Sequence, residues 1–348
     1  MTAQGKNNLD ETNTFNKLHV GEWVEVRCQN EILATLDEHG CLDNLPFMPE
    51  MLQFCGKKYL VYKRADKTCD TITGNYHSRR MQNAVHLVDL RCDGVAHGGC
   101  DVTCMIFWKE AWLKRVDNKT GVARKSGNAG DRGPVVADTP NLGCTLEGLY
   151  QATKSENSDS LDEDVYSCQA TELLRATRPL PWWDIRQYWR DLASGNFNAS
   201  DFVRVLAIGI INRFSVKLRG IRIYPFFDTR LMVESGTPKE NLDLQPGEMV
   251  QVKNLPEILR TLDKLGKNRG LYYDMNGEML KYCNKKAKVL KRVRKVIDEK
   301  TGKLLVLKNE SVILEGMICC GHFSPNRLLC PRAQYPFWRE IWLTRIDA

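Results

Sequence analysis

The sequence predicts an α+β protein, mainly β with a helical insert, in which two duplicated small β-barrels are joined by a helical region. Three observations lead to this prediction. Apolar and polar residues alternate over 20–27 and over 246–252, which is the period of a β-strand. The sequence around these strands occurs twice in the chain. A segment of helical period, 166–214, lies between the two occurrences.

The duplication is visible as segments that recur in the same order and at nearly the same spacing. EILATLD, EMLQFCGKKYLVYKR and FWKEAWLKRV of the first copy correspond to EILRTLD, EMLKYCNKKAKVLKR and FWREIWLTRI of the second. The matched segments begin at Glu31 and Glu257, at Glu50 and Glu278, and at Phe107 and Phe337. A correspondence this regular over about ninety residues indicates a tandem pair of copies.

The opening G-E-W/M-V-x-V of each copy resembles the first strand of SH3-like barrels of the KOW type. The LPFMPEML and HGGC segments are similar to those of an uncharacterised bacterial family with such tandem repeats. The resemblance implies two SH3-like barrels, and it implies no activity.

Composition divides the chain into five segments. They are, in order, a disordered lead-in, the first barrel, a polar linker, the helical insert and the second barrel: 1–17, 18–116, 117–165, 166–243 and 244–348. In the insert we expect Trp182, Trp183, Trp189 and Phe202 to be buried against the barrels, because aromatic residues at helical spacing form a core stripe.

The composition, 43% hydrophobic and 27% charged, is that of a globular protein. No run of about 18 apolar residues is present, so we expect no membrane span. The N-terminal residues lack the apolar core of a secretory signal, and thirteen cysteines without one favour a reducing, cytoplasmic location. The net charge of +7 permits an anionic partner without requiring one.

Four cysteines form the candidate site: Cys69, Cys92, Cys100 and Cys104. Seven residues separate Cys92 from Cys100, three separate Cys100 from Cys104, and Cys69 comes from the end of a preceding strand. Thiolates bind soft and borderline metals, and four of them close a zinc site or hold a four-iron cluster. A metal–thiolate site in the first barrel is therefore predicted, against the alternative of unligated cysteines in a reduced core.

The metal and the fourth ligand stay open. The chain has no C-x-x-C pair, which disfavours structural zinc and favours an iron–sulfur cluster, with [4Fe-4S] first and zinc as the alternative. Cys168, His86 and His97 are rival ligands. If only three thiolates bind, one metal keeps an open position for a substrate.

The second copy repeats only part of this group. Cys100 aligns with Cys330 and, after a two-residue insertion, Cys92 aligns with Cys320. The other two candidate ligands align with residues other than cysteine. The second copy therefore cannot hold the same site alone, although Cys319, Cys320 and Cys330 remain candidates for a shared site.

We expect an iron–sulfur protein, a biosynthetic or redox enzyme that binds a small substrate between the site and the helical insert. No phosphate loop, G-x-S-x-G or H-E-x-x-H occurs, which removes several enzyme classes. The alternative is a zinc-stabilised, non-enzymatic nucleic-acid- or protein-binding module that uses the basic segment 285–295. Nucleic acid is the less favoured partner, because lysines also protect strand edges.

Overall fold

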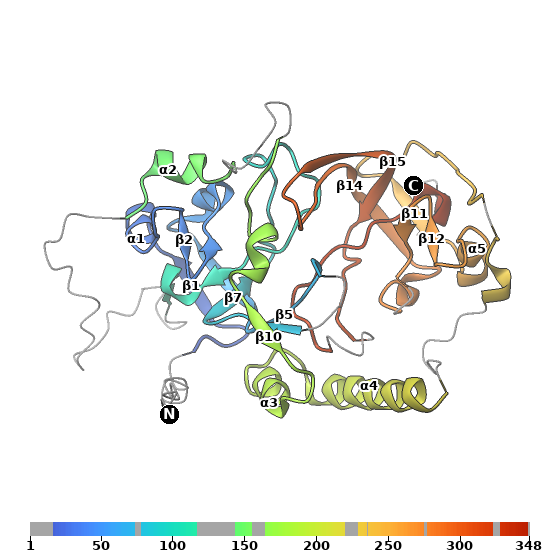
Figure 1. Ribbon diagram of the computed structural model, residues 1–348, viewed down its shortest axis with the longest axis horizontal. Coiled ribbons are helices and arrows are strands. Elements are labelled where there is room, and N and C mark those ends of the chain that lie inside the picture. The colour runs from blue at the N-terminus through green and yellow to red at the C-terminus, as the bar shows by residue number, and fades with distance from the viewer. Residues whose placement is uncertain are drawn as a thin grey trace, which may run out of the picture.

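The computed structural model describes eight segments of the chain: residues 17–73, 78–116, 143–154, 164–219, 229–234, 236–274, 277–322 and 328–346. Nearly all of the predicted lead-in over 1–17 and most of the predicted linker over 117–165 lie outside the described residues. Within them the chain is an α+β protein with several antiparallel sheets, which confirms the predicted class (Figure 1).

The first half, residues 17–116, is rich in short strands. Its elements are β1 (Trp23–Val26), α1 (Gln29–Leu33), β2 (Cys41–Leu42), β3 (Leu45–Pro46), the 3₁₀-helix η2 (Pro49–Phe54), β4 (Lys58–Arg64), β5 (Lys67–Cys69), β6 (Ser78–Arg80), β7 (Ala84–Leu87), β8 (Trp108–Lys109), η3 (Glu110–Trp112) and β9 (Leu113–Arg115). The main sheet has the order β8-β7-β4-β1-β9.

The second half, residues 236–346, follows the same plan. Its elements are β11 (Met249–Val252), α5 (Leu255–Leu259), β12 (Lys267–Asn268), β13 (Leu271–Tyr272), η6 (Leu280–Tyr282), β14 (Lys286–Ile297), β15 (Leu304–Leu314), η7 (Glu340–Trp342) and β16 (Leu343–Arg345). The sheet has the order β15-β14-β11-β16, in which β14 is an inner strand.

The segment between the halves holds most of the helical residues. Its elements are α2 (Leu146–Gln151), η4 (Thr171–Leu174), β10 (Arg178–Leu180), α3 (Ile185–Ala193), α4 (Ala199–Arg219) and η5 (Thr229–Leu231). α2 lies in the predicted linker and packs Leu149 into the core of the first half. None of the helices in the described part is long and apolar enough to cross a membrane.

The two main sheets share an irregularity. β4 pairs with β7 and shifts register between Val61 and Lys63. β14 pairs with β15 and shifts register between Val289 and Lys291, which stand at the same places in the matched segment of the second copy. A bulge is a specific local feature rather than a general property of sheets. The two halves therefore agree in strand order and in a detail of strand pairing.

Matched aromatic residues fill the two cores. The buried indole of Trp112 donates a hydrogen bond to the hydroxyl of Thr35 (3.1 Å), and that of Trp342 donates to Thr261 (2.9 Å). Phe47 packs edge-on against Trp112, with ring centroids 5.2 Å apart. A buried indole N–H usually finds such a partner, and here the hydroxyl fixes the orientation of each of these two tryptophans.

The insert is less buried than predicted. We expected Trp182, Trp183, Trp189 and Phe202 to pack against the barrels, but the three tryptophans are 37%, 66% and 71% exposed and Phe202 is only partly buried. α3 instead turns Asp191 inward, where it forms a buried ion pair with Lys67 of β5 (Oδ2 to Nζ, 2.5 Å). The prediction was wrong because apolar periodicity does not reveal a buried ion pair, and here the pair decides which side of the helix is covered.

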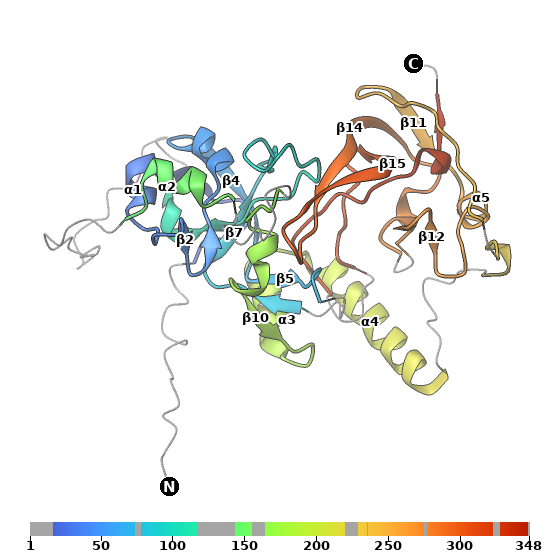
Figure 2. The same ribbon diagram turned by 45° about the horizontal axis from the view of Figure 1, so that its top comes forward.

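Each half sends a segment to the other. β5 lies between the halves in both views (Figures 1 and 2). The hairpin of β14 and β15 reaches back toward the first half. There the ammonium group of Lys291 lies 3.0 Å from the carboxylate of Asp101. The hairpin also contacts the segment between the halves, where the amide of Leu304 donates to the carbonyl of Asp164 (3.1 Å). The cysteine sites lie where these segments meet.

Candidate metal centre

Three of the four predicted ligands lie on one tightly folded loop between β7 and β8. The amide of Cys92 donates to the carbonyl of Cys104 (2.9 Å), which closes the base of the loop. Inside it, the amide of Gly99 donates to the carbonyl of Gly94 (3.0 Å). Gly94 has φ 76°, and a Cβ at this position would clash with the backbone of Cys100. The turn that presents the thiols therefore requires this glycine.

Cys168 completes a group of four thiols. Cys92, Cys100, Cys104 and Cys168 all line one cavity of about 40 Å³. Cys168 precedes η4, and its amide donates to the hydroxyl of Thr171 (2.9 Å), which fixes the backbone at this point. The structure thus brings the rival ligand Cys168 to the three loop cysteines. We call these four thiols and their cavity the first centre.

Burial keeps the four thiols neutral in the protein alone. It raises the pKa of Cys104 to about 12 and that of Cys168 to about 11. It also raises the pKa of Cys92 and of Cys100. Neutral thiols are poor nucleophiles, whereas a metal replaces their protons when it binds. The surroundings therefore suit metal ligation better than thiolate catalysis.

Cys69 lies elsewhere. It lines a different cavity, of about 160 Å³, together with Cys319 and Cys330 of the second half. Its thiol is hydrogen-bonded with that of Cys330. Arg332 lines both this cavity and that of the first centre. Sequence spacing carries no information on this placement, because β5 is separate from the main sheet and pairs only with β6.

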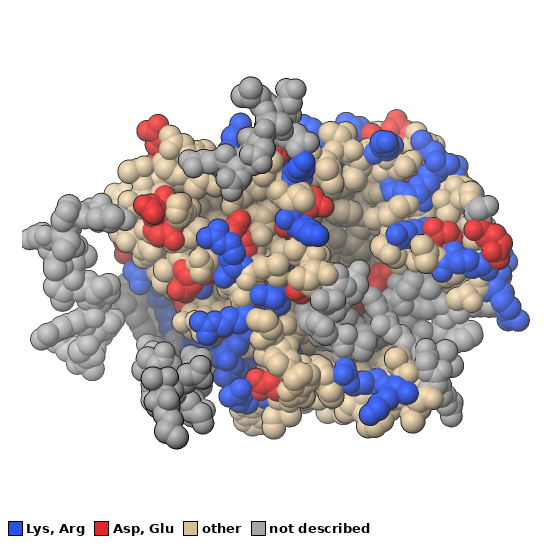
Figure 3. All heavy atoms as spheres, viewed as in Figure 1, with Lys and Arg blue, Asp and Glu red and all other residues tan. Residues whose placement is uncertain are grey.

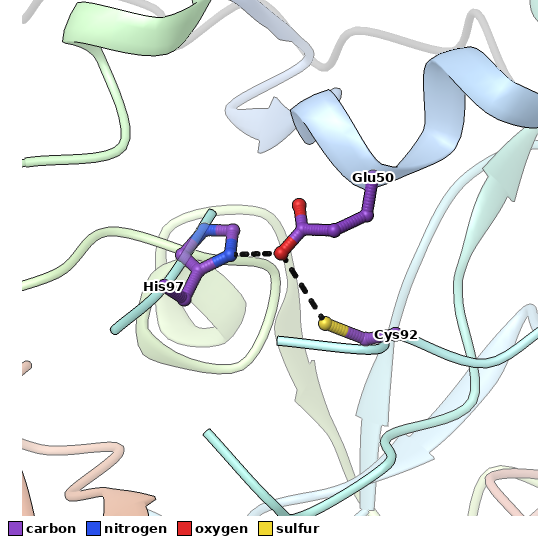
Figure 4. Close-up of side chains that lie close together, drawn as sticks. All are labelled: Glu50, Cys92 and His97. Atoms are coloured by element: carbon purple, nitrogen blue, oxygen red, sulfur yellow. Dashed lines mark hydrogen bonds and ion pairs between the residues drawn. The ribbon is translucent and has the colours of Figure 1, made fainter. Parts of the chain in front are cut away.

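A buried carboxylate that the sequence analysis missed lies beside Cys92. Nδ1 of His97 lies 2.5 Å from Oε1 of Glu50, and Sγ of Cys92 lies 3.8 Å from the same oxygen (Figure 4). Burial alone would raise the pKa of Glu50, but its contacts with His97 and with backbone amides together lower it. The other oxygen, Oε2, is buried without a hydrogen-bond partner among the described residues. An ionised carboxylate with an unpaired oxygen fits a cation.

A signal for this glutamate exists in the sequence. Glu50 stands in the apolar segment LPFMPEML, and Glu278 stands in the matching EML of the second copy. Glu278 is also buried, and it accepts a hydrogen bond from the thiol of Cys320 (2.9 Å). A charged residue at an apolar position of both copies indicates a specific partner.

The spacing of the ligand atoms distinguishes two kinds of metal site. Within the described chain, Glu50, Cys92 and His97 are the group whose ligand atoms all lie within 4.8 Å of one another. No three of the first-centre thiols, all of them described, come this close. A tetrahedral zinc ion would hold sulfurs about 3.8 Å apart, since Zn–S bonds are about 2.3 Å long. A cluster with one thiolate on each iron spaces them more widely.

The structure thus places the predicted residues in three environments. The loop cysteines and Cys168 share the first centre, His97 lines the same cavity and pairs with Glu50, and Cys69 belongs to the second cavity. His86 is fully buried, and its Nδ1 lies 2.8 Å from the carbonyl oxygen of Ile106. No protein-family model, curated protein or solved structure matches the chain.

Proposed function

We propose that the chain is an iron–sulfur protein whose cluster, [4Fe-4S] in the first place, is held by Cys92, Cys100, Cys104 and Cys168. The observation that carries the proposal is the convergence of four thiols, from two distant segments, on one cavity. Buried free cysteines often serve as small apolar residues. Four around one cavity, spaced more widely than a single ion requires, support a four-iron cluster over a single ion.

The surroundings of the first centre suit a biosynthetic or redox enzyme. A bound cluster supplies electron transfer. Arg332 is buried at the cavity wall and pairs with Glu299 (Nη2 to Oε1, 3.1 Å), so it provides a fixed positive charge beside the thiolates. Residues 168–170, at the start of the helical insert, line the same cavity. A small substrate held between the cluster and the insert is the partner that this arrangement supports.

We also infer that the two halves are diverged copies of one SH3-like barrel of the KOW type, as in the bacterial tandem-repeat family that the sequence resembles. The shared strand order and the register shifts at matching places in the two copies support this inference. All thirteen cysteines are free thiols, which supports a reducing, cytoplasmic location.

A second candidate is a zinc-stabilised binding module. The group of Glu50, Cys92 and His97 favours it, because their ligand atoms already lie at single-ion spacing. The carbonyl of Ser167 lies 3.1 Å from Nε2 of His97, so it would orient the ring of a histidine that binds metal through Nδ1. Three protein ligands would leave one zinc position open.

The basic strand gives this candidate less support. Arg292 and Arg294 of β14 both pair with Glu310 of β15. Lys286 and Lys288 are exposed at the start of the strand. On the face shown in Figure 3, basic side chains of the second half alternate with acidic ones. Phosphate binding depends on uncompensated positive charge, so nucleic acid remains the less favoured partner.

Anaerobic purification, followed by a visible spectrum and analysis of iron, sulfide and zinc, tests the choice. An iron–sulfur protein is brown and contains sulfide, and Cys92→Ser and Cys100→Ser each remove the iron of the first centre. A colourless protein with stoichiometric zinc, lost in Glu50→Gln and His97→Gln, establishes the second candidate instead. Full metal content in both cysteine variants contradicts the ligand assignment.

A further inference from the structure

The second half contains a group of thiols that takes no part in the proposed cluster. Cys319 and Cys330 line the cavity of about 160 Å³ together with Cys69, which the first half contributes through β5. The thiols of Cys69 and Cys330 are hydrogen-bonded, and Cys319 lies near enough to Cys330 to raise its pKa. Three thiols from both halves therefore meet in one place.

The loop that carries these cysteines is closed like the loop of the first centre. The amide of Cys319 donates to the carbonyl of Gln334 (2.8 Å), as that of Cys92 does to Cys104 (2.9 Å). The sequence alignment matched Cys92 with Cys320, but these hydrogen bonds match it with Cys319. The contact with a buried glutamate matches Cys92 with Cys320, as the alignment does, so the two neighbouring cysteines divide the contacts of Cys92 between them.

A close approach of a glycine to a cysteine backbone also occurs in both loops. A Cβ at Gly321 would clash with the backbone of Cys330, as one at Gly94 would clash with the backbone of Cys100. Both glycines have positive φ, 70° and 76°. Five residues separate Gly94 from Cys100, and eight separate Gly321 from Cys330. The longer loop still places Cys330 against the glycine, so Cys319 and Cys330 occupy the places of Cys92 and Cys100.

Each cavity is lined in part by the opposite half, and at one pair of equivalent positions the two halves exchange side chains. Ile297, at the end of β14, lines the cavity of the first centre. Cys69, which aligns with Ile297 in the repeat, lines the other cavity. The exchange of segments is thus reciprocal, and it delivers an inert side chain to the first cavity and a thiol to the second. The first cavity has Cys104 and Cys168 to complete its donor set.

We propose that Cys69, Cys319 and Cys330 form a second thiolate centre for iron in a cluster, since these three described thiols also lie farther apart than a single ion requires. It has three protein thiolates where the first centre has four, and it opens on a larger cavity. A metal with three protein ligands keeps one position for an exchangeable ligand, which is the usual distinction between reactive and closed sites. The second centre therefore offers an exchangeable metal position that the four-thiolate first centre lacks.

Metal content of cysteine variants tests this proposal. The full chain is purified anaerobically, analysed for zinc, reconstituted with ferrous iron and sulfide, and analysed again. Cys69→Ser and Cys330→Ser each lose the metal of the second centre, and the double variant loses no more than either single variant. Cys92→Ser loses only the remaining metal. Loss of iron together with sulfide supports a cluster at the second centre, and loss of zinc alone overturns it.

Cys320→Ser is the matched control. Cys320 follows Cys319 in the chain, but its thiol donates a hydrogen bond to Glu278. It keeps full metal content. Unchanged metal in both Cys69→Ser and Cys330→Ser overturns the second centre and leaves the iron–sulfur proposal standing. Unchanged metal in Cys92→Ser, together with loss in Cys69→Ser and Cys330→Ser, overturns the ligand assignment of the first centre and leaves the second centre standing.

A measurement on the unmodified chain covers the case in which the variants misfold. Iodoacetamide is applied before and after metal removal by a chelator, and the alkylated peptides are identified by mass spectrometry. Cys69, Cys319 and Cys330 become reactive only after the metal is removed. Equal alkylation in both states, or a Cys69–Cys330 disulfide in the anaerobic protein, overturns the proposal.

Discussion

Thr71 is hydrogen-bonded to Glu299, which is its equivalent in the second copy. Equivalent positions of two copies touch only near the axis that relates the copies. Arg332 binds both residues, with Nη1 2.9 Å from the hydroxyl of Thr71 and Nη2 3.1 Å from the carboxylate of Glu299. Because Arg332 lines both thiol cavities, this contact lies at the junction of the two centres.

Replacement of Glu299 by glutamine should destabilise the protein. The change removes the charged partner of Arg332, whose side chain is only 3% exposed. A lost hydrogen bond to a buried charged group lowers the free energy of unfolding by about 2 kcal/mol. Urea unfolding of the metal-free protein measures this difference. Glu315→Gln, at an exposed position of the same half, is the control and should change stability by no more than about 0.5 kcal/mol. Equal stability of the two variants would contradict a structural role for the contact.

His86→Ile should remove part of the loss of stability in mild acid. Burial lowers the pKa of His86 from 6.5 to about 3, so the unfolded chain takes up a proton near neutral pH and the folded chain does not. This histidine therefore stabilises the fold above about pH 6.5, and the contribution falls as the pH drops toward 3. Between pH 7 and pH 5 the free energy of unfolding therefore falls by about 2 kcal/mol, since one pKa unit corresponds to about 1.4 kcal/mol.

Isoleucine is the natural replacement because the second half already has it. His86 faces Lys63 in the first sheet, and Ile313 faces Lys291 at the equivalent place in the second. Urea unfolding gives the free energy of unfolding at pH 7 and at pH 5. The difference between the two values should be smaller by about 2 kcal/mol in the variant than in the unmodified chain. His39→Gln, at a side chain 75% exposed, should keep the difference of the unmodified chain. The same difference in all three proteins would contradict a neutral, buried His86.

The fold class could be predicted because the relevant signals are local or repeated. Alternation over 20–27 located β1, and the matched segments located its partner β11. The exchange of β5 could not be predicted, because three residues pairing away from the main sheet leave no periodic signal. The exposure of Trp183 and Trp189 was missed for a related reason, since the Lys67–Asp191 ion pair joins residues 124 positions apart.

The candidate site was predictable only where its ligands are close in sequence. The loop of Cys92, Cys100 and Cys104 was found from spacing and composition. Spacing could not rank Cys69 against Cys168, because that choice depends on which distant segment packs against the loop. Glu50 could not be identified from spacing, because it lies 42 positions before Cys92 and stands alone in an apolar segment.

Gly94→Ala should impair the first centre much more than Gly99→Ala. Both glycines have φ 76°, so alanine at either position adds backbone strain of about 1–2 kcal/mol. A Cβ at Gly94 would also meet the backbone of Cys100, whereas nothing lies within 4 Å of one at Gly99. The comparison isolates the clash from the strain. Metal analysis should show loss of the first-centre metal in Gly94→Ala and retention in Gly99→Ala. Equal retention would mean that the turn does not position Cys100.

Cys168→Ser should abolish the metal of the first centre, because this thiol lines the cavity together with the three loop cysteines. A cluster bound by four thiolates is lost or severely destabilised when one is replaced. Visible absorbance and iron content of the reconstituted protein provide the measurement. Cys144→Ser is the matched control, since Cys144 is a buried free thiol that packs in the core of the first half. It should keep its iron with only a modest loss of stability. If Cys168→Ser keeps the first-centre iron and Cys69→Ser loses it, the fourth ligand is Cys69, and β5 must move to reach the loop when metal binds.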